Sequence, residues 1–188
     1  MTLTKNVFRQ NCLKKIKKSS QHNKFYKNYL LNKKLIDEIS AYAGKKRLKI
    51  LFYYPLPFEA DIRKSLKILG KKHEVFIPFM EGKSFKMVPF RLPLKKKNFG
   101  VFEAGNTIKN INKIDIAIVP AVGVDGKLQR VGFGKGMYDR FFEKLNKKPY
   151  TIFTQPEFCY TKKLICDAYD VSCDVLITPR KTIKRGTL

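Results

Sequence analysis

A strand-like run followed by a glycine-rich turn and a helix constrains the fold of this chain more than any other feature. The apolar run IDIAIVP at 114–120 ends in a proline, and RVGFGKGMYDR at 130–140, which contains the glycine loop (132–136), leads into a helical pattern from Met137. Alternating glycines let the backbone approach a ligand closely, and N–H groups at a helix start bind anions. This unit predicts an α/β fold with an anion site in the glycine loop.

The glycine loop matches neither of the common nucleotide-binding patterns. It has no Gly-Lys-Ser/Thr of a P-loop and no G-x-G-x-x-G of a dinucleotide fingerprint. A tight turn with solvated charges is the alternative for a bare G-x-G-x-G pattern. Arg130, Lys135 and Arg140 supply positive charge, however, and Asp139 supplies a carboxylate that could hold a metal. These charges favour the anion site.

Strand and helix patterns alternate along the chain. Strands are expected within 47–55, 73–79, 86–92, 98–104, 110–120, 149–155 and 174–179. A helix at 58–72 would bury Ile62, Leu66 and Leu69 and end at Gly70. This alternation predicts a mostly parallel sheet covered on both faces, with ligands beyond the carboxyl ends of the strands.

Residues 4–44 carry a helical pattern that ends at Gly44. The residues expected to face the core are Phe8, Cys12, Leu13 and Ile16 in a first segment, and Tyr26, Tyr29, Leu30, Ile36 and Ile39 in a second. The basic segment from about residue 181 to 188 is expected to be a loosely held tail.

The chain has 188 residues, which suits a single domain, 1–188. Its 40 Lys and Arg against 15 Asp and Glu give a net charge of +25, which concentrates polyanions, either nucleic acid or a small phosphorylated or polycarboxylate molecule. A solvated basic surface explains most of the lysine runs equally well.

Four cysteines, at 12, 159, 166 and 173, form no C-x-x-C pair, and the two histidines lie far from them in sequence, which argues against a zinc site. No segment has the character of a signal peptide or a membrane span. The expectation is therefore a cytoplasmic protein with reduced thiols and no membrane partner.

The segment IVPAVGVDGKLQRVGFGKGMYDRFFEKL resembles the signature region of the 5-formyltetrahydrofolate cyclo-ligases, also called methenyltetrahydrofolate synthetases. The likeness extends to Lys5 and Arg9 in the first helix, to YYPLPFEADI, to FIPF before Met87, to FGVFEA and to AYDVSCDVLITP. It covers nearly the whole chain.

The resemblance implies a three-layer α/β/α sandwich with a mostly parallel sheet, similar to the NagB/RpiA/CoA-transferase-like fold. It also implies ATP- and Mg²⁺-dependent cyclisation of 5-formyltetrahydrofolate, with or without a polyglutamate tail, to 5,10-methenyltetrahydrofolate, ADP and phosphate. The implied mechanism moves the γ-phosphoryl group to the formyl oxygen, so that N10 attacks an activated carbon. A monomer without a specific nucleic-acid partner is expected.

The resemblance assigns ATP contacts to Lys5, Arg9, Arg130, Gly132, Phe133, Gly134, Lys135, Gly136, Met137 and Tyr138. Of these, Arg130 and Lys135 would be catalytic, because they neutralise the charge that moves during transfer. Asp139 and Asp170 match magnesium carboxylates, and two carboxylates with phosphate oxygens and water suit Mg²⁺. Without the family, the first-helix pair would be an ordinary basic face, and Asp170 a loop or cap aspartate.

On the substrate side the resemblance assigns Tyr54, Glu59, Met87 and Phe99. A Glu59 carboxylate can accept paired N–H donors from a pterin edge, although alone it would be a helix-start acid. Met137, Leu128 and Ala104 depart from the family pattern of tyrosine, glycine and proline. Two alternatives stay open: a family paralogue that binds nucleotide without turnover, and a basic nucleic-acid-binding protein.

Overall fold

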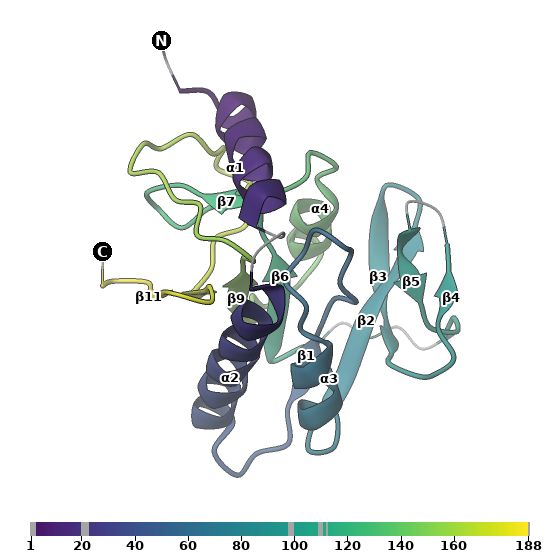
Figure 1. The fold of residues 1–188 in the computed structure, drawn as a ribbon. Helices are drawn as coiled ribbons and strands as arrows, with labels where there is room; N and C mark the ends of the chain where they lie inside the picture. The colour runs from purple at the N-terminus through teal and green to yellow at the C-terminus, as the bar shows by residue number, and fades with distance from the viewer. Residues whose placement is uncertain (1–2, 20–22, 98–99, 109–110, 112, 188) are drawn as a thin grey trace.

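The computed structural model describes residues 3–19, 23–97, 100–108, 111 and 113–187 (Figure 1). The helices are α1 (Lys5–Ser19), α2 (Lys24–Ala43), α3 (Arg63–Leu69) and α4 (Met137–Glu143). The strands are β1 (Lys49–Leu51), β2 (Glu74–Glu81), β3 (Ser84–Pro89), β4 (Lys95–Lys96), β5 (Phe102–Glu103), β6 (Ile116–Pro120), β7 (Gly123–Val124), β8 (Arg130–Val131), β9 (Tyr150–Thr154), β10 (Val175–Ile177) and β11 (Thr182–Lys184). Within this described part, none of the helices is both long and apolar enough to span a membrane.

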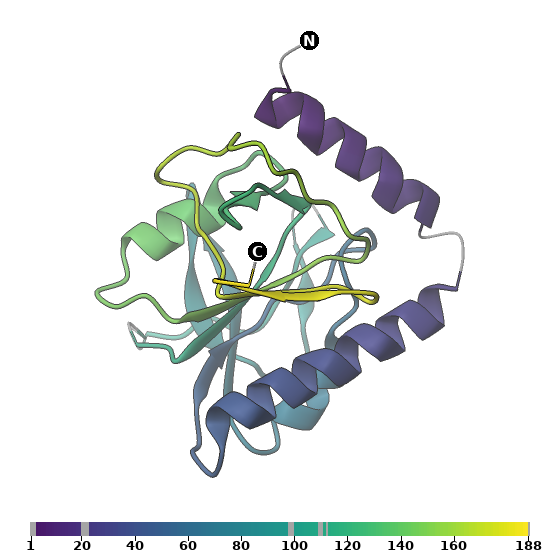
Figure 2. The ribbon, with the colours of Figure 1, turned by 90° about the vertical axis from the view of Figure 1, so that its left-hand side faces the viewer.

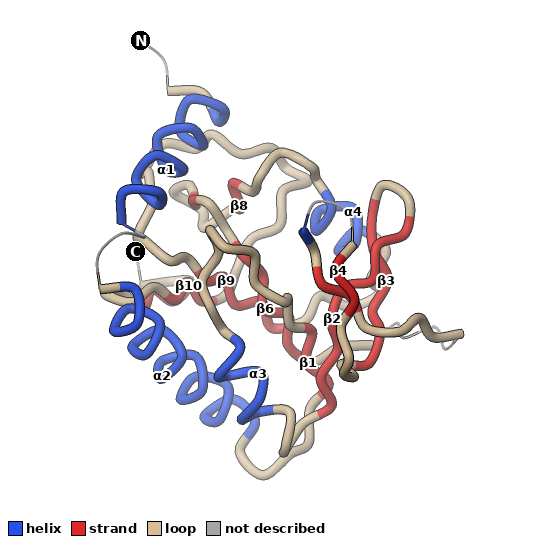
Figure 3. The backbone as a smooth tube through the Cα atoms, turned by 45° about the vertical axis from the view of Figure 1, so that its right-hand side comes forward, coloured by secondary structure: helices blue, strands red, loops and turns tan. Residues whose placement is uncertain are grey.

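Seven strands form the central sheet, in the order β11-β10-β9-β6-β1-β2-β3 (Figure 3). The five inner strands pair in parallel, and only the edge strands β11 and β3 run antiparallel. Strand β6 lies in the middle and is buried along its whole length. The predicted α/β fold with a mostly parallel sheet is confirmed.

Helices cover both faces of this sheet, as Figure 2 shows with α2 and α4 on opposite sides. Alternate residues of β6 face the two layers: Ile116 and Ile118 pack in the cluster with α2 and α3, while Ala117 and Val119 pack in the cluster with α4. This two-residue alternation is what a strand buried on both faces requires. It gives the three layers that were expected.

The buried face of α2 matches only part of the one that the sequence pattern indicated, since Ile39 is buried and Ile36 packs against the core but the two tyrosines do not. Leu31, Leu35 and Ile39 are fully buried, whereas Tyr26 and Tyr29 are 62% and 51% exposed. The aliphatic residues repeat every four positions and so make one continuous stripe that the sheet can bury. A tyrosine can stay in water because its hydroxyl group is hydrated there. In α1 the expected face is correct, with Phe8, Cys12 and Ile16 buried.

A short hairpin of β7 and β8 separates β6 from the glycine loop, so the loop does not follow the central strand directly. The predicted helix after the loop begins at Met137 as expected. The segment that was expected to be a loose basic tail instead forms β11, which pairs with β10 along Val175–Ile177. The polar sequence of this segment does not predict a strand. It forms one because the unpaired edge of β10 offers backbone hydrogen-bond partners.

Leu128, in the turn between β7 and β8, has a φ of 56°, a left-handed conformation that a leucine rarely adopts. Its side chain is buried in the cluster beneath α4. We expect Leu128→Ala to lower the free energy of unfolding by about 2–5 kcal/mol, because the packing is lost and the strained φ remains. Leu128→Gly loses the same packing but relieves the strain, so it should be more stable than the alanine variant by about 1 kcal/mol.

Chemical denaturation of the two variants measures this difference. An alanine variant as stable as the glycine variant would show that the backbone at Leu128 is not strained in solution.

Candidate active site

The glycine loop connects β8 to α4, and two arginine side chains lie directly against it. A Cβ at Gly132 would approach the Arg130 guanidinium to 2.5 Å, and a Cβ at Gly136 would lie 2.8 Å from the Arg140 guanidinium. Gly136 also has a φ of 61°, which disfavours other residues. These positions therefore need glycine so that two cations can sit beside the loop backbone.

Arg130 is the buried cation of this site, with an exposed fraction of 6%. Its Nε donates to the Pro120 carbonyl oxygen at 2.9 Å, and its guanidinium lies 4.9 Å from the Tyr138 ring centroid. One nitrogen is 3.9 Å from a carboxylate oxygen of Asp139. Burial lowers the pKa of Arg130, and the charge of Asp139 chiefly opposes this shift. The contacts hold a charged group rigidly behind the glycine loop.

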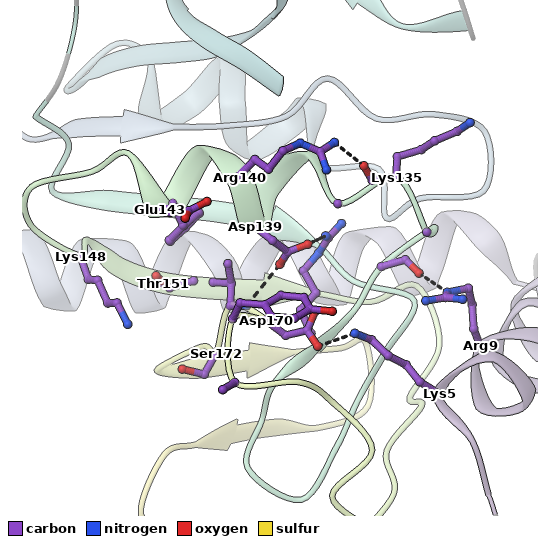
Figure 4. Close-up of a pocket in the computed structure, with 18 residues that line it drawn as sticks. Lys5, Arg9, Lys135, Asp139, Arg140, Glu143, Lys148, Thr151, Asp170 and Ser172 are labelled. Carbon is purple, nitrogen blue, oxygen red and sulfur yellow. Dashed lines mark hydrogen bonds and ion pairs between the residues drawn. The ribbon is translucent and has the colours of Figure 1, made fainter. Parts of the chain in front are cut away.

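Helix α1 brings two further cations to the same place from the other end of the chain (Figure 4). Lys5 forms ion pairs with Asp170 and, at 3.1 Å, with Asp167. Arg9, one helical turn later, donates from Nε to the Gly132 carbonyl oxygen at 2.8 Å. Burial alone would lower the pKa of Lys5. Its hydrogen bonds to Asp170 and Asp167 outweigh this effect, so the pKa is raised overall and the amine stays charged.

These groups line one open cleft of about 670 Å³. Its lining comes from α1, the glycine loop, α4 and the 168–172 segment, with the following residues: Lys5, Arg9, Arg130, Gly132, Gly134, Lys135, Gly136, Asp139, Arg140, Phe142, Glu143, Lys148, Thr151, Ala168, Tyr169, Asp170, Val171 and Ser172. Five cations therefore meet beside the backbone of the glycine loop. Two come from α1, Lys5 and Arg9, and three come from residues 130–140. That arrangement suits a ligand with several negative charges.

Both predicted magnesium carboxylates also line this cleft. Asp139 accepts the Val171 backbone N–H at 3.3 Å, and Asp170 accepts the Asp167 N–H at 2.7 Å. Among the described residues, no three His, Cys, Asp or Glu side chains group as a metal site. Two hard carboxylate ligands fit Mg²⁺ only if phosphate oxygens and water complete its coordination.

Three of the residues predicted to contact ATP are not part of the cleft lining. The Phe133 ring contacts the Phe58 ring, with centroids 4.9 Å apart. Met137 packs against the core cluster beneath α4, and Tyr138 is buried in it under Arg130. These side chains therefore anchor the loop, and only the backbone at these positions could contact a ligand in the cleft.

Glu59 lies outside the cleft, in a neighbouring cavity of about 30 Å³. It precedes α3, which begins at Arg63, so it is not a helix-start acid. Its carboxylate accepts the Leu56 N–H at 2.9 Å. Burial raises the pKa of Glu59 to about 7, against the Leu56 hydrogen bond and the charge of Arg130. Glu59 therefore does not line the cleft, although its neighbour Phe58 contacts Phe133 of the glycine loop and the charge of Arg130 reaches its carboxylate.

The other predicted substrate residues are dispersed. Tyr54 is half-buried, with its ring 5.3 Å from that of Phe102. Met87 has an exposed fraction of 2% and packs in the core, so it presents no surface to a ligand in this conformation. Phe99 lies outside the described residues.

Several residues that line the cleft were not predicted as site residues from the sequence. Arg140 was counted only as local charge, yet its guanidinium donates to the Lys83 carbonyl oxygen at 2.8 Å and to the Lys135 carbonyl oxygen at 2.5 Å. It thereby ties the glycine loop to the β2–β3 turn. Lys148 and Ser172 carry no local pattern. They precede β9 and β10, and the parallel pairing of these two strands brings them to the same cleft.

The mostly parallel sheet with helices on both faces places the chain in the class of α/β proteins, and its basic, glycine-lined cleft suits an anionic ligand. The family model of the 5-formyltetrahydrofolate cyclo-ligase family matches residues 1–179. The chain belongs to that family.

Curated relatives carry the same family name. The 5-formyltetrahydrofolate cyclo-ligase of Mycoplasma pneumoniae is 24% identical over 93% of this chain and 98% of its own length. That of Haemophilus influenzae is 34% identical, but the match covers 31% of this chain and only 33% of the relative. A probable cyclo-ligase of Schizosaccharomyces pombe is 32% identical over 37% of this chain and 40% of its own length.

Solved structures share the fold. The 5,10-methenyltetrahydrofolate synthetase of Aquifex aeolicus has a TM-score of 0.72 at 24% identity, covering 97% of this chain and 93% of its own. The synthetase of Mycoplasma pneumoniae has a TM-score of 0.69 at 24% identity, covering 94% and 99%.

Proposed function

We propose that this protein uses ATP and Mg²⁺ to cyclise 5-formyltetrahydrofolate to 5,10-methenyltetrahydrofolate, releasing ADP and phosphate. Family membership supports the reaction class. The observation that carries the proposal for this chain is the cleft, where Lys5 and Arg9 of α1 meet Arg130 and the glycine loop. Such a convergence of cations and backbone N–H groups stabilises a triphosphate.

In this proposal the chain's own residues act mainly by position and charge. Glycine-loop N–H groups and Lys135 hold the phosphates, while Arg130 faces the charge that develops as the γ-phosphoryl group moves to the formyl oxygen. Asp139 and Asp170 would hold Mg²⁺, which supplies charge neutralisation to the phosphates when bound. Glu59, ionised, would accept N–H donors of the pterin.

In this proposal the protein acts as a monomer in the cytoplasm, on a reduced folate that carries a polyglutamate tail. The four cysteines are free, which suits the reducing cytoplasm. The net charge of +25 favours a reduced folate with an anionic polyglutamate tail over a neutral ligand.

Incubating the purified chain with 5-formyltetrahydrofolate, ATP and Mg²⁺ tests the proposal through the absorbance of the methenyl product. We expect product only when all three are present. ATP binding without product would instead indicate a paralogue lacking turnover. Sequence-specific retention of nucleic acid at physiological salt, without turnover, would favour the nucleic-acid alternative.

A further inference from the structure

Three of the four cysteines gather beneath α1, in a small apolar cluster. Cys12 and Cys159 are buried there, with exposed fractions of 2% and 5%, and the half-buried Cys166 packs against the same cluster. All are free thiols. The proposed reaction uses no thiol, so this grouping is independent of it.

Strand β7 positions both buried sulfurs. The Cys12 sulfur packs so closely on Gly123 that an added Cβ there would lie 3.2 Å from it. The next residue, Val124, donates its N–H to the Cys159 carbonyl oxygen at 3.0 Å. Both side chains pack in the same apolar cluster, and each thiol shifts the pKa of the other. They therefore lie close together in the fold, although they come from opposite ends of the chain.

The segment around Cys159 is tied to α1 at successive turns. Lys15 donates from Nζ to the Phe158 carbonyl oxygen at 2.7 Å, and Ser19 donates to the Glu157 carboxylate. Residues 12, 15 and 19 lie on one face of a helix, since they are three and four positions apart. Two hydrogen bonds thus align the segment that carries Cys12 with the segment that carries Cys159.

The two thiols differ chemically. The hydrogen bond from Cys12 and the charge of Lys15 lower the pKa of Cys159, although burial and Glu157 oppose them. The pKa of Cys12 is raised, because its proton is held in that hydrogen bond and the thiol is buried. A stabilised thiolate next to a protonated thiol is the arrangement of an attacking and a resolving cysteine.

We propose that Cys12 and Cys159 form a reactive thiol pair that exchanges with low-molecular-weight disulfides. The Cys159 thiolate attacks one sulfur of the disulfide, whose S–S bond breaks, and the first small thiolate leaves with the proton of Cys12. Cys12 then attacks the Cys159 sulfur and releases the second small thiolate, which takes a proton from water. The two protein thiols are oxidised to one disulfide, and the small disulfide is reduced to two thiols.

The resulting bond would fasten α1, which carries Lys5 and Arg9 into the cleft, to the segment after β9. Because both thiols are buried, exchange requires local opening of α1.

Oxidised glutathione, applied to the folded full-length chain, tests the pair by intact mass and peptide mapping. We expect the wild type to lose two hydrogen atoms and to yield a peptide cross-linked between Cys12 and Cys159. Cys166→Ser is the matched control and should give the same cross-link. A wild type that keeps all four thiols after prolonged incubation, or a cross-link through Cys166 or Cys173, overturns the proposal.

Single variants test the two roles. Cys12→Ser keeps a hydroxyl donor but cannot resolve, so it should trap glutathione on Cys159. Cys12→Ala lacks the donor, so less of Cys159 is thiolate and the variant should react roughly threefold more slowly, because the higher nucleophilicity of a thiolate with a higher pKa offsets part of the loss. Cys159→Ser should leave Cys12 unmodified. A glutathione adduct on Cys12 in that variant, or equal rates for the serine and alanine variants, contradicts the assigned roles.

Discussion

Arg130→Ala is expected to lower ATP-dependent turnover by roughly ten- to a hundredfold, the loss of one charge-assisted contact to phosphate. Its guanidinium is the buried cation behind the glycine loop, 3.9 Å from Asp139. Steady-state kinetics with varied ATP measure the effect, and calorimetry with 5-formyltetrahydrofolate should show little change in folate affinity.

Arg180→Ala provides the matched control, because it removes the same charge from an exposed position outside the cleft. It should leave ATP kinetics unchanged. Arg130→Lys keeps the charge but not the planar fork, so it should recover only part of the activity. Wild-type ATP kinetics in Arg130→Ala would remove the glycine-loop cleft from the reaction.

The alanine variant should also be less stable. It leaves the Asp139 carboxylate without its cation and the Pro120 carbonyl oxygen without its donor. We expect a loss of about 1–3 kcal/mol in the free energy of unfolding, so turnover must be measured below the unfolding transition.

Glu59→Gln is expected to weaken reduced-folate binding by roughly ten- to a hundredfold while leaving ATP binding nearly intact, since one charged acceptor oxygen becomes a donor. Because the pKa of Glu59 is raised to about 7, folate affinity of the wild type should rise as pH increases through 7. The glutamine variant should show no such step. Calorimetric titrations between pH 6 and pH 8 measure both effects.

The stability of the wild type should change in the opposite direction to its folate affinity: it should fall relative to that of Glu59→Gln as pH increases. A carboxyl with a raised pKa binds its proton more tightly in the folded state, so its contribution to stability is lost as pH rises from 4.5 through about 7. At pH 8 Glu59→Gln should therefore be more stable than the wild type by on the order of 3 kcal/mol.

Glu81→Gln, at the exposed end of β2, is the matched control for the loss of a carboxylate. Unchanged folate affinity in Glu59→Gln would leave the carboxylate with the structural role of binding the Leu56 N–H. A pH-independent folate affinity in the wild type would show that ionisation of Glu59 does not control binding.

Local patterns accounted for much of the fold and for one side of the cleft. The pattern of apolar residues predicted the β6 strand and the α4 helix, because a short apolar run and a helical spacing are each visible within one segment. The pattern failed where two apolar stripes competed, as in α2, and where a polar edge strand was recognised only by its partner, as in β11. Neither choice is encoded within a single segment.

The sequence by itself determined the chemistry available to this protein: glycines able to lie against guanidinium groups, a basic first helix, and carboxylates in two distant segments. Only the tertiary structure decided which of these groups meet. Lys5 reaches Asp170 across 165 positions because α1 packs over β7, and Glu59 is kept from the cleft because its segment turns back on Leu56. Burial then set their protonation, since desolvation and the nearest charges depend on packing rather than on residue type.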